Sequence, residues 1–193
     1  MAKVNFLELV NDIYLNAAVV KQMKTAFKNT GVLRLDSFFN ELKYKAIFDL
    51  FDSINGKKKK IADRFSFEEM NAHKIKKMFA SKEFISFISS IIGKKFYKIK
   101  VEVRRFRHRD YTLVHDFNSR GIEFFMFFSK GWSDKLGGQL VYRDVDGKSL
   151  IFNVRGDSFV LINSRSYRKF VKYVNHLAGK RSFVLIEGKI ITL

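Results

Sequence analysis

The sequence predicts a mainly β protein with additional α-helices, in which a β-sandwich or jelly-roll core follows N-terminal helices that pack against it. Three observations support this fold class. Apolar residues recur at helical spacing as far as residue 92. From Phe96 the apolar residues alternate with polar ones, which is typical of half-buried strands. Between residues 111 and 142, aromatic and β-branched runs end in turns at roughly even spacing, as in sandwiches and jelly rolls.

Composition sets the size and class of the protein. The chain has 193 residues and 47% hydrophobic content, and it predicts one domain, 1–193, with a mainly helical part at 1–95 and a jelly-roll core at 96–193. The absence of cysteine excludes disulfides and thiolate metal sites. Because no apolar run reaches 18 residues and no cleavage signal follows the first residues, we expect a soluble cytoplasmic protein that does not bind membranes.

The first half of the chain carries the helical periodicity. A stripe of apolar residues predicts one amphipathic helix over 4–27, which Gly31 follows. Further predicted elements are a strand at 32–35, a helix at 38–51, a turn with a solvated lysine run at 55–60, a strand at 61–67, a capping box from Ser66 to Glu69, a helix at 70–79 and a helix at 81–92. Together these elements predict a helical layer with a few short strands.

The second half carries the alternating pattern. Predicted strands lie at 96–106, 111–114, 122–128, 139–143, 149–154, 158–162 and 182–186, with a continuation at 190–193. The stretch Asp144–Gly147 predicts the turn of a hairpin. A basic segment that contains Phe170, Tyr173 and Val174 admits a helix before the last strand. This order of short strands is what predicts the core.

The charge of the chain is strongly positive. The net charge is +18 and the pI is about 10. Such an excess favours polyanions, chiefly RNA or a ribonucleoprotein, because lysine and arginine neutralise phosphates and release counterions. The candidate nucleic-acid contacts are Lys57, Lys58, Lys59, Lys60, Arg104, Arg105, Arg107 and Arg109. The alternative interpretation is that these lysines simply solvate the surface of a small protein.

Several segments in order resemble a known family. They are Phe84–Gly93, Arg109–Asp116, Leu136–Tyr142 and Asn153–Ile162. Their order and spacing over residues 80–193 are similar to the iron(II)/2-oxoglutarate oxygenases, in particular the prolyl-hydroxylase branch that modifies a ribosomal-protein proline. The resemblance implies a double-stranded β-helix core, iron(II) and 2-oxoglutarate as cofactors, and a side chain of a protein partner as substrate.

The resemblance also implies positions for the metal ligands. The family binds iron with two histidines and one carboxylate, the first two as His-x-Asp/Glu. His115 matches the first histidine, but Phe117 stands where the carboxylate is expected. Asp116 is adjacent, and in a strand it points to the opposite face unless a bulge intervenes. The second histidine is expected near residues 170–172, where the chain has Phe, Val and Lys; His176 lies a few residues further on.

The cosubstrate contacts and a competing motif follow from the same alignment. Arg181 matches the basic residue that binds the distal carboxylate of 2-oxoglutarate, with Phe183 as the alternative position, and Tyr111 is a further implied contact. A literal His-x-Asp also occurs at His108 and Asp110. The arginines around it oppose binding of a divalent cation.

Two functions and a weaker third remain open at this point. The first is a degenerate oxygenase that has lost iron binding and acts as a basic binding module for RNA or a ribonucleoprotein. The second is an active hydroxylase of a protein side chain with a rearranged site. This site would use His115, His176 and either Asp116 or Asp134, with Arg181 for the cosubstrate. The third is a catalyst of another class that uses the same barrel mouth. No catalytic residue is assigned.

Overall fold

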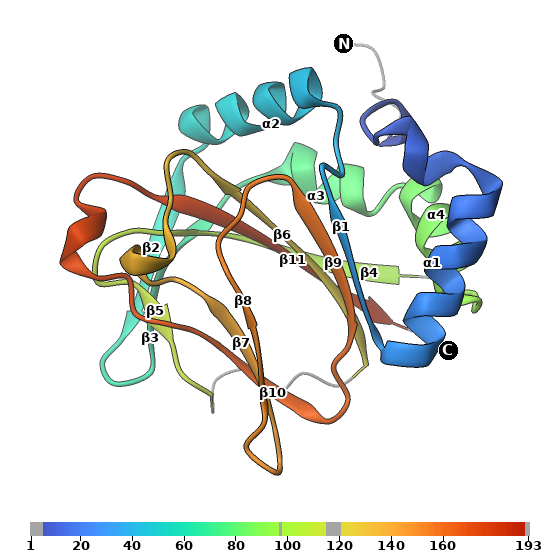
Figure 1. The fold of residues 1–193 in the computed structure, drawn as a ribbon. Coiled ribbons are helices and arrows are strands. Elements are labelled where there is room, and N and C mark those ends of the chain that lie inside the picture. The colour runs from blue at the N-terminus through green and yellow to red at the C-terminus, as the bar shows by residue number, and fades with distance from the viewer. Residues whose placement is uncertain (1–5, 97, 115–120, 192–193) are drawn as a thin grey trace.

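The computed structural model of the chain describes residues 6–96, 98–114 and 121–191. Helices, a large antiparallel sheet and a small antiparallel sheet form successive layers, so the expected mainly β fold with helices is confirmed (Figure 1). None of the helices in the described ranges is long and apolar enough to cross a membrane.

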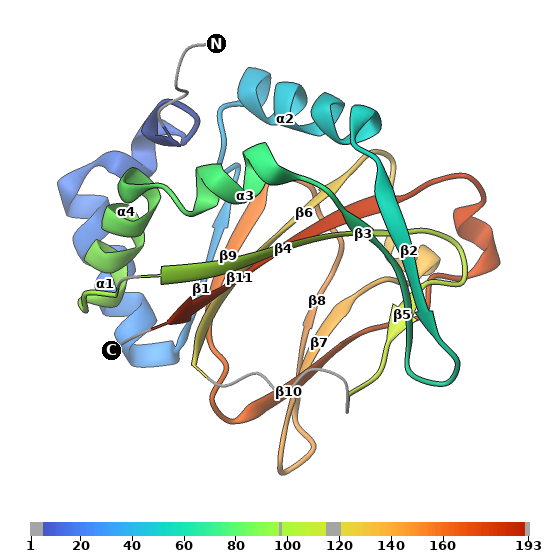
Figure 2. The same ribbon diagram turned by 180° about the vertical axis from the view of Figure 1, so that it is seen from behind.

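The large sheet contains most of the strands, and its order is β1-β9-β6-β11-β4-β3-β2, with β5 paired to β3. The small sheet has the order β10-β7-β8. The strands are β1 (Val32–Asp36), β2 (Gly56–Ile61), β3 (Phe65–Met70), β4 (Lys98–Phe106), β5 (Tyr111–Thr112), β6 (Ile122–Ser129), β7 (Leu140–Asp144), β8 (Ser149–Phe152), β9 (Ser158–Asn163), β10 (Tyr167–Val171) and β11 (Phe183–Ile191). Residues before 96 therefore supply both ends of the large sheet, β1 at one and β2 with β3 at the other (Figure 2).

Four α-helices cover the outer face of the large sheet: α1 (Ala17–Thr30), α2 (Glu41–Ser53), α3 (His73–Phe79) and α4 (Lys82–Ile92). Residues at the two ends of α4 determine where this helix begins and stops. Ser81 caps α4 through a hydrogen bond from the Phe84 N–H, and Gly93 ends it in the left-handed conformation. The helices and the outer sheet face share one core, rich in phenylalanine.

Alternate residues of β6 face the two different hydrophobic cores of the protein. Phe124, Met126 and Phe128 point into the core beneath the helices. Phe125 and Phe127 belong to the second core, which lies between the two sheets. β6 is thus apolar on both faces, because it is covered on both.

Two of the expected elements take a different form at the N-terminus and in the lysine run. The expected helix over 4–27 is instead two 3-10 turns, at Phe6–Glu8 and Asp12–Leu15, followed by α1. The side chains of Asn11 and Asn16 accept backbone N–H groups and restart the helix at each point. The lysine run is strand β2, whose residues pair with β3 opposite Glu68 and Glu69, so that opposite charges face each other across the strands.

Two further expectations are wrong for the same reason, namely long-range pairing. Ser66 and Glu69 lie within strand β3 and do not form a helix cap. The basic segment around residue 170 is strand β10 followed by a 3-10 turn at His176–Ala178, and it is not a helix. β10 pairs with β7 along its length, which local sequence does not reveal.

Candidate functional site

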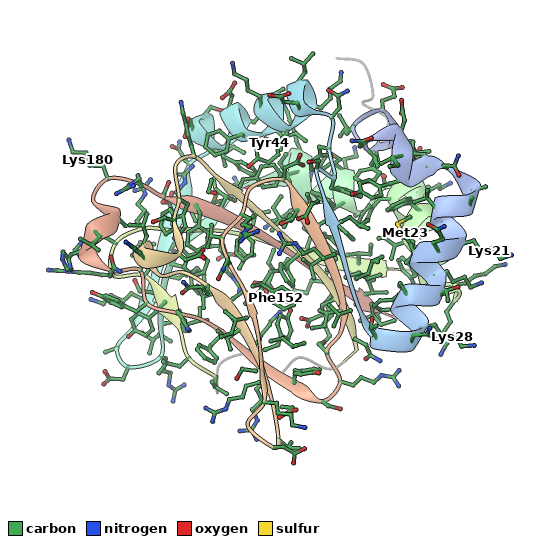
Figure 3. All side chains as sticks on the ribbon, viewed as in Figure 1. Lys21, Met23, Lys28, Tyr44, Phe152 and Lys180 are labelled. Carbon is green, nitrogen blue, oxygen red and sulfur yellow. The ribbon has the colours of Figure 1, made fainter. Side chains whose placement is uncertain are left out.

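The space between the two sheets is the place where a jelly roll carries its ligands, and aromatic side chains occupy much of it. Phe183 stacks on Phe106 at 5.1 Å between ring centroids and meets the edge of Trp132 at 4.9 Å. Phe152 from the small sheet lies 4.9 Å from Phe125 of the large sheet, and it is seen between the sheets in Figure 3. The part of the interior formed by these aromatic side chains is a packed apolar core.

A buried network of charges lies beside that core. Lys169 Nζ on β10 is 2.8 Å from Glu123 Oε2 on β6 and 2.9 Å from Glu187 Oε1 on β11. Arg104 Nη1 on β4 is 2.7 Å from Glu187 Oε2, and the Tyr142 hydroxyl donates to Glu123 Oε2 at 3.0 Å. All of these side chains are nearly buried, so the network links the two sheets inside the protein.

The ionisation of the network follows from its geometry. Burial alone would lower the pKa of Lys169, but the Glu187 and Glu123 carboxylates outweigh it and raise that pKa. Burial likewise opposes ionisation of Glu187, and Lys169 and Arg104 nevertheless lower its pKa. Burial, with Glu123 second, raises the pKa of Tyr142 well above its ordinary value, so the phenol stays protonated. The cluster is therefore a charged, mutually neutralised ion network.

The metal ligands expected from the sequence are only partly within the described residues. His115 and Asp116 lie outside them. His176 begins an exposed 3-10 turn. Asp134 is exposed and its Oδ2 accepts a hydrogen bond from Asn153 Nδ2 at 2.7 Å. Where the second histidine is expected, Val171 is buried in the apolar core and Lys172 is exposed.

The expected cosubstrate residue Arg181 is engaged elsewhere. Its guanidinium donates to the backbone carbonyls of Leu177 at 2.7 Å, Ala178 at 3.2 Å and Gly131 at 3.3 Å. These bonds hold the turn before β11 against the loop after β6. The alternative position, Phe183, is part of the aromatic core. Tyr111 lies on β5 and is half-buried.

The competing motif at His108 and Asp110 has a structural role. Asp110 is buried, and its carboxylate accepts from the Ser66 hydroxyl at 2.6 Å and the Arg107 N–H at 2.9 Å, and pairs with Lys58. These partners occupy both carboxylate oxygens. Asp110 therefore fixes the turn between β4 and β5, and its charge is already paired with Lys58.

The described residues do not fit the iron site of the oxygenases. Such a site needs two imidazoles and one carboxylate with open coordination positions. Within residues 6–96, 98–114 and 121–191, no three histidine or acidic side chains come together as a metal cluster. The buried carboxylates Glu123 and Glu187 already have cationic partners. Arg181, with three carbonyl partners, does not fit a 2-oxoglutarate contact.

The basic residues expected to bind nucleic acid divide into two groups. Arg104 and Arg105 are buried at 7% exposure each. Arg104 belongs to the ion network, and Arg105 bonds Glu68 at 3.3 Å and the Phe51 carbonyl. Lys57, Lys58, Lys60, Arg107 and Arg109 are exposed and Lys59 is half-buried. We call these six residues the basic edge.

Contacts at Asp110 bring the two halves of the basic edge together. Lys58 on edge strand β2 pairs with Asp110, and Asp110 holds the turn that presents Arg107 and Arg109. Arg109 adopts a left-handed φ of 73°, and its N–H donates to the Val174 carbonyl at 2.9 Å. Next to this turn, the rings of Tyr111 and Tyr173 lie 6.3 Å apart, and Tyr173 is 50% exposed.

The ion network was not expected from the sequence. Glu123 precedes a run of aromatic residues on β6, Glu187 follows four apolar residues on β11, and Lys169 lies between Arg168 and Phe170 on β10. A charged residue at an inward position of an alternating strand was the available signal. Which strands would face one another was not available from the sequence.

Solved structures of other proteins share this fold. A Pseudomonas putida prolyl-4-hydroxylase has a TM-score of 0.68 at 11% identity over 90% of this chain and 99% of its own. A Burkholderia pseudomallei oxidoreductase of the 2OG-Fe(II) oxygenase family has a TM-score of 0.65 at 10% identity, covering 90% and 92% of the two chains. A Trichoplax adhaerens prolyl hydroxylase, solved with a peptide fragment of the hypoxia-inducible factor oxygen degradation domain, has a TM-score of 0.64 at 13% identity, covering 92% and 91%.

The fold is therefore the jelly roll of the 2-oxoglutarate- and iron-dependent oxygenases, of prolyl-hydroxylase type, as the sequence resemblance predicted. A family model described as "oxoglutarate and iron-dependent oxygenase degradation C-term" matches residues 50–190, and the chain belongs to this family. No curated protein sequence matches the chain.

Proposed function

We propose that the chain is a non-catalytic binding module built on the oxygenase fold, and that it binds RNA, free or within a ribonucleoprotein, in the cytoplasm. The basic edge is the binding surface. One observation carries this proposal: the Lys58–Asp110 ion pair brings together, on one surface, two groups of cations that lie about fifty residues apart in the sequence.

The interior supports a non-catalytic role. Aromatic rings fill one end of the space between the sheets, and the ion network of Lys169, Glu123 and Glu187 occupies the other. Among the residues that the structure describes, no histidine and acidic side chains come together as an iron(II) site requires. The active-hydroxylase alternative would need His115, His176, either Asp116 or Asp134, and Arg181, of which the structure describes Asp134, His176 and Arg181. All three are exposed, and Asp134 and Arg181 hydrogen-bond other groups.

The surface supports a nucleic acid. Lysine and arginine contacts with phosphates would supply the affinity, and they make binding depend on salt. Tyr173, half exposed beside Arg109 and Tyr111, offers a ring on which an unpaired base can stack. The buried carboxylate of Asp110 fixes the turn in advance, which reduces the entropy lost on binding.

Binding of a fluorescent single-stranded RNA, measured by anisotropy at several KCl concentrations, tests the proposal. For the wild type we expect affinity to fall steeply with salt. The double variant Lys57→Glu/Lys60→Glu should bind at least about tenfold more weakly, with a salt slope smaller by about 1.5. The matched control is Lys21→Glu/Lys28→Glu, the same charge change on α1, whose two side chains project outward far from β2 (Figures 1 and 3). Equal losses of RNA affinity in the two double variants, or no RNA binding by the wild type, would refute the proposal that the basic edge binds RNA.

A second measurement tests the non-catalytic part separately. Purified protein is titrated with Mn²⁺ and 2-oxoglutarate and its melting temperature is followed. We expect no shift beyond that produced by MgCl₂ of equal ionic strength, because a ligand stabilises a protein only through binding to the native state. A shift that requires both Mn²⁺ and 2-oxoglutarate would establish a working cofactor site and overturn this part of the proposal.

A further inference from the structure

We propose that the ammonium group of Lys169 is a built-in cation, filling a cation-binding site between the two sheets that Glu123, Glu187 and Tyr142 form. The site accepts a free cation once the Lys169 side chain is removed. This inference goes beyond the proposed RNA-binding function and does not depend on what the surface binds.

The donors of this site come from different layers. Glu123 on β6 and Glu187 on β11 belong to the large sheet, and Tyr142 on β7 belongs to the small one. Lys169 reaches between them from β10 of the small sheet, at 2.8 Å from Glu123 and 2.9 Å from Glu187. The Lys169 ammonium, which belongs to the small sheet, thus neutralises two carboxylates of the large sheet. A free cation bound between the sheets would do the same.

Burial makes the cation necessary. The side chains of Glu123 and Glu187 are only 5% and 9% exposed, so water cannot solvate their charges. Arg104 neutralises Glu187 from the other side, and it also pairs with Glu102, which lies directly opposite Glu187 on β4. Like charges opposite each other on neighbouring strands repel. Without the Lys169 ammonium, the buried carboxylates would outweigh the remaining cation.

The oxygens define which cations fit. The carboxylates of Glu123 and Glu187 are hard donors, which bind ammonium groups through hydrogen bonds and divalent cations such as Mn²⁺ through coordination. Tyr142 orients Glu123 through its hydroxyl, and its ring centroid lies 6.0 Å from the Lys169 ammonium. Removal of the lysine side chain beyond Cβ leaves space for n-propylammonium, which has the atoms that the Lys169→Ala substitution deletes. A buried cavity that has lost a charged group accepts a ligand that restores both volume and charge.

The test is cation rescue of the Lys169→Ala variant, followed by thermal unfolding. We expect n-propylammonium chloride at saturating concentration to raise its melting temperature by at least about 4 °C over NaCl of equal ionic strength. Wild type should not respond, and neither should Lys172→Ala, the matched control, because Lys172 is an exposed lysine on the same segment. A parallel titration with MnCl₂ decides whether the site is selective for ammonium groups or takes any hard cation.

The proposal is overturned if neither cation stabilises Lys169→Ala more than NaCl, or if the wild type responds equally. If Lys169→Ala does not fold, the yield of refolding with and without n-propylammonium gives the same comparison. Independently, Lys169→Met/Glu123→Gln should melt higher than Lys169→Met, because the second substitution removes the carboxylate that has lost its partner. If Lys169 served only to fill space, the second substitution would give no such recovery, and this outcome would also overturn the proposal.

Discussion

Gly188 on β11 lies directly opposite Phe124 on β6, and the Phe124 ring occupies the space where a side chain on residue 188 would begin. A Cβ atom on Gly188 would be 1.9 Å from Phe124 Cε1. Phe124 itself is fully buried and packs against Phe79, Phe84 and Phe159. The glycine therefore admits a large ring at the centre of the sheet.

Gly188→Ala is expected to destabilise the protein by about 2–3 kcal/mol, since the new methyl group overpacks a core that cannot yield without moving Phe124. Urea unfolding followed by circular dichroism measures this loss. The double variant Gly188→Ala/Phe124→Leu should be more stable than Gly188→Ala alone, because the smaller side chain vacates the contact. Additive losses in the double variant would show that the two residues do not compete for space.

The ion network should make stability depend on pH at both extremes. The pKa of Glu187 is below its ordinary value of 4.5 in the folded state, so its stabilisation is complete above 4.5 and is lost as pH falls through the folded pKa. The pKa of Lys169 is above 10.5, so its contribution is complete below 10.5 and is lost as pH rises through the folded value. Denaturant unfolding from pH 3 to 11 should give a plateau with two falling limbs. In Lys169→Met/Glu187→Gln both limbs should be shallower, and parallel profiles would contradict this.

Asp157 should show the opposite dependence. Burial raises its pKa to about 6, although its carboxylate accepts the Phe39 N–H at 2.9 Å, and the charge of Asp36 contributes. A raised carboxyl pKa favours the protonated native state, so the ionised group costs stability above pH 6 and the cost disappears as pH falls toward 3.8.

Asp157→Asn should therefore raise the free energy of unfolding at pH 8, by less than about 1 kcal/mol because the half-buried carboxylate is partly solvated. Asparagine also tolerates the positive φ of 60° at this position. The advantage should vanish below pH 4, as urea unfolding at both pH values can test. An advantage of the same size at both pH values would show that ionisation is not its cause.

Gly137 combines a steric restriction with a backbone conformation of φ 82° and ψ −157° that is essentially reserved for glycine, whereas Gly131 has open space around it. Both have a positive φ, of 82° and 61°, but a Cβ on Gly137 would lie 2.0 Å from the Tyr173 carbonyl oxygen, whereas one on Gly131 meets nothing within 4 Å. Gly131→Ala should cost about 1 kcal/mol, the backbone term alone. Gly137→Ala should cost at least about 2 kcal/mol more, because the backbone of the loop after β10 must move. Thermal unfolding of the two variants compares their stabilities. Equal losses of stability would contradict a steric conflict between residue 137 and the Tyr173 carbonyl.

The parts of the fold that the sequence predicted are those governed by local periodicity. β4 alternates, β6 is almost uniformly apolar, and α4 has both a Ser cap and a terminal Gly. β11 was expected as two pieces, 182–186 and 190–193, but it is one strand because it pairs with β4 and β6 through Gly188. β2 and β10 were missed because their charges find partners far along the chain, Lys58 at Asp110 and Lys169 at Glu123. The burial of Arg104 was missed for the same reason. These cases were determined by pairing between residues far apart in the sequence, and local periodicity does not show which residues pair.

The position of β11 has a consequence for how the chain assembles during synthesis. β11 is the strand that joins β4 to β6 at the centre of the large sheet, and it follows all of its partners in the sequence. A ribosome therefore releases β1, β2 and β3 long before the strand that completes their sheet exists. During that interval β6 can pair with β9, and β4 with β3, but each has one edge open, and open edges of apolar strands favour aggregation. The large sheet is complete only after residues 183–191 have emerged, when β11 joins its two halves.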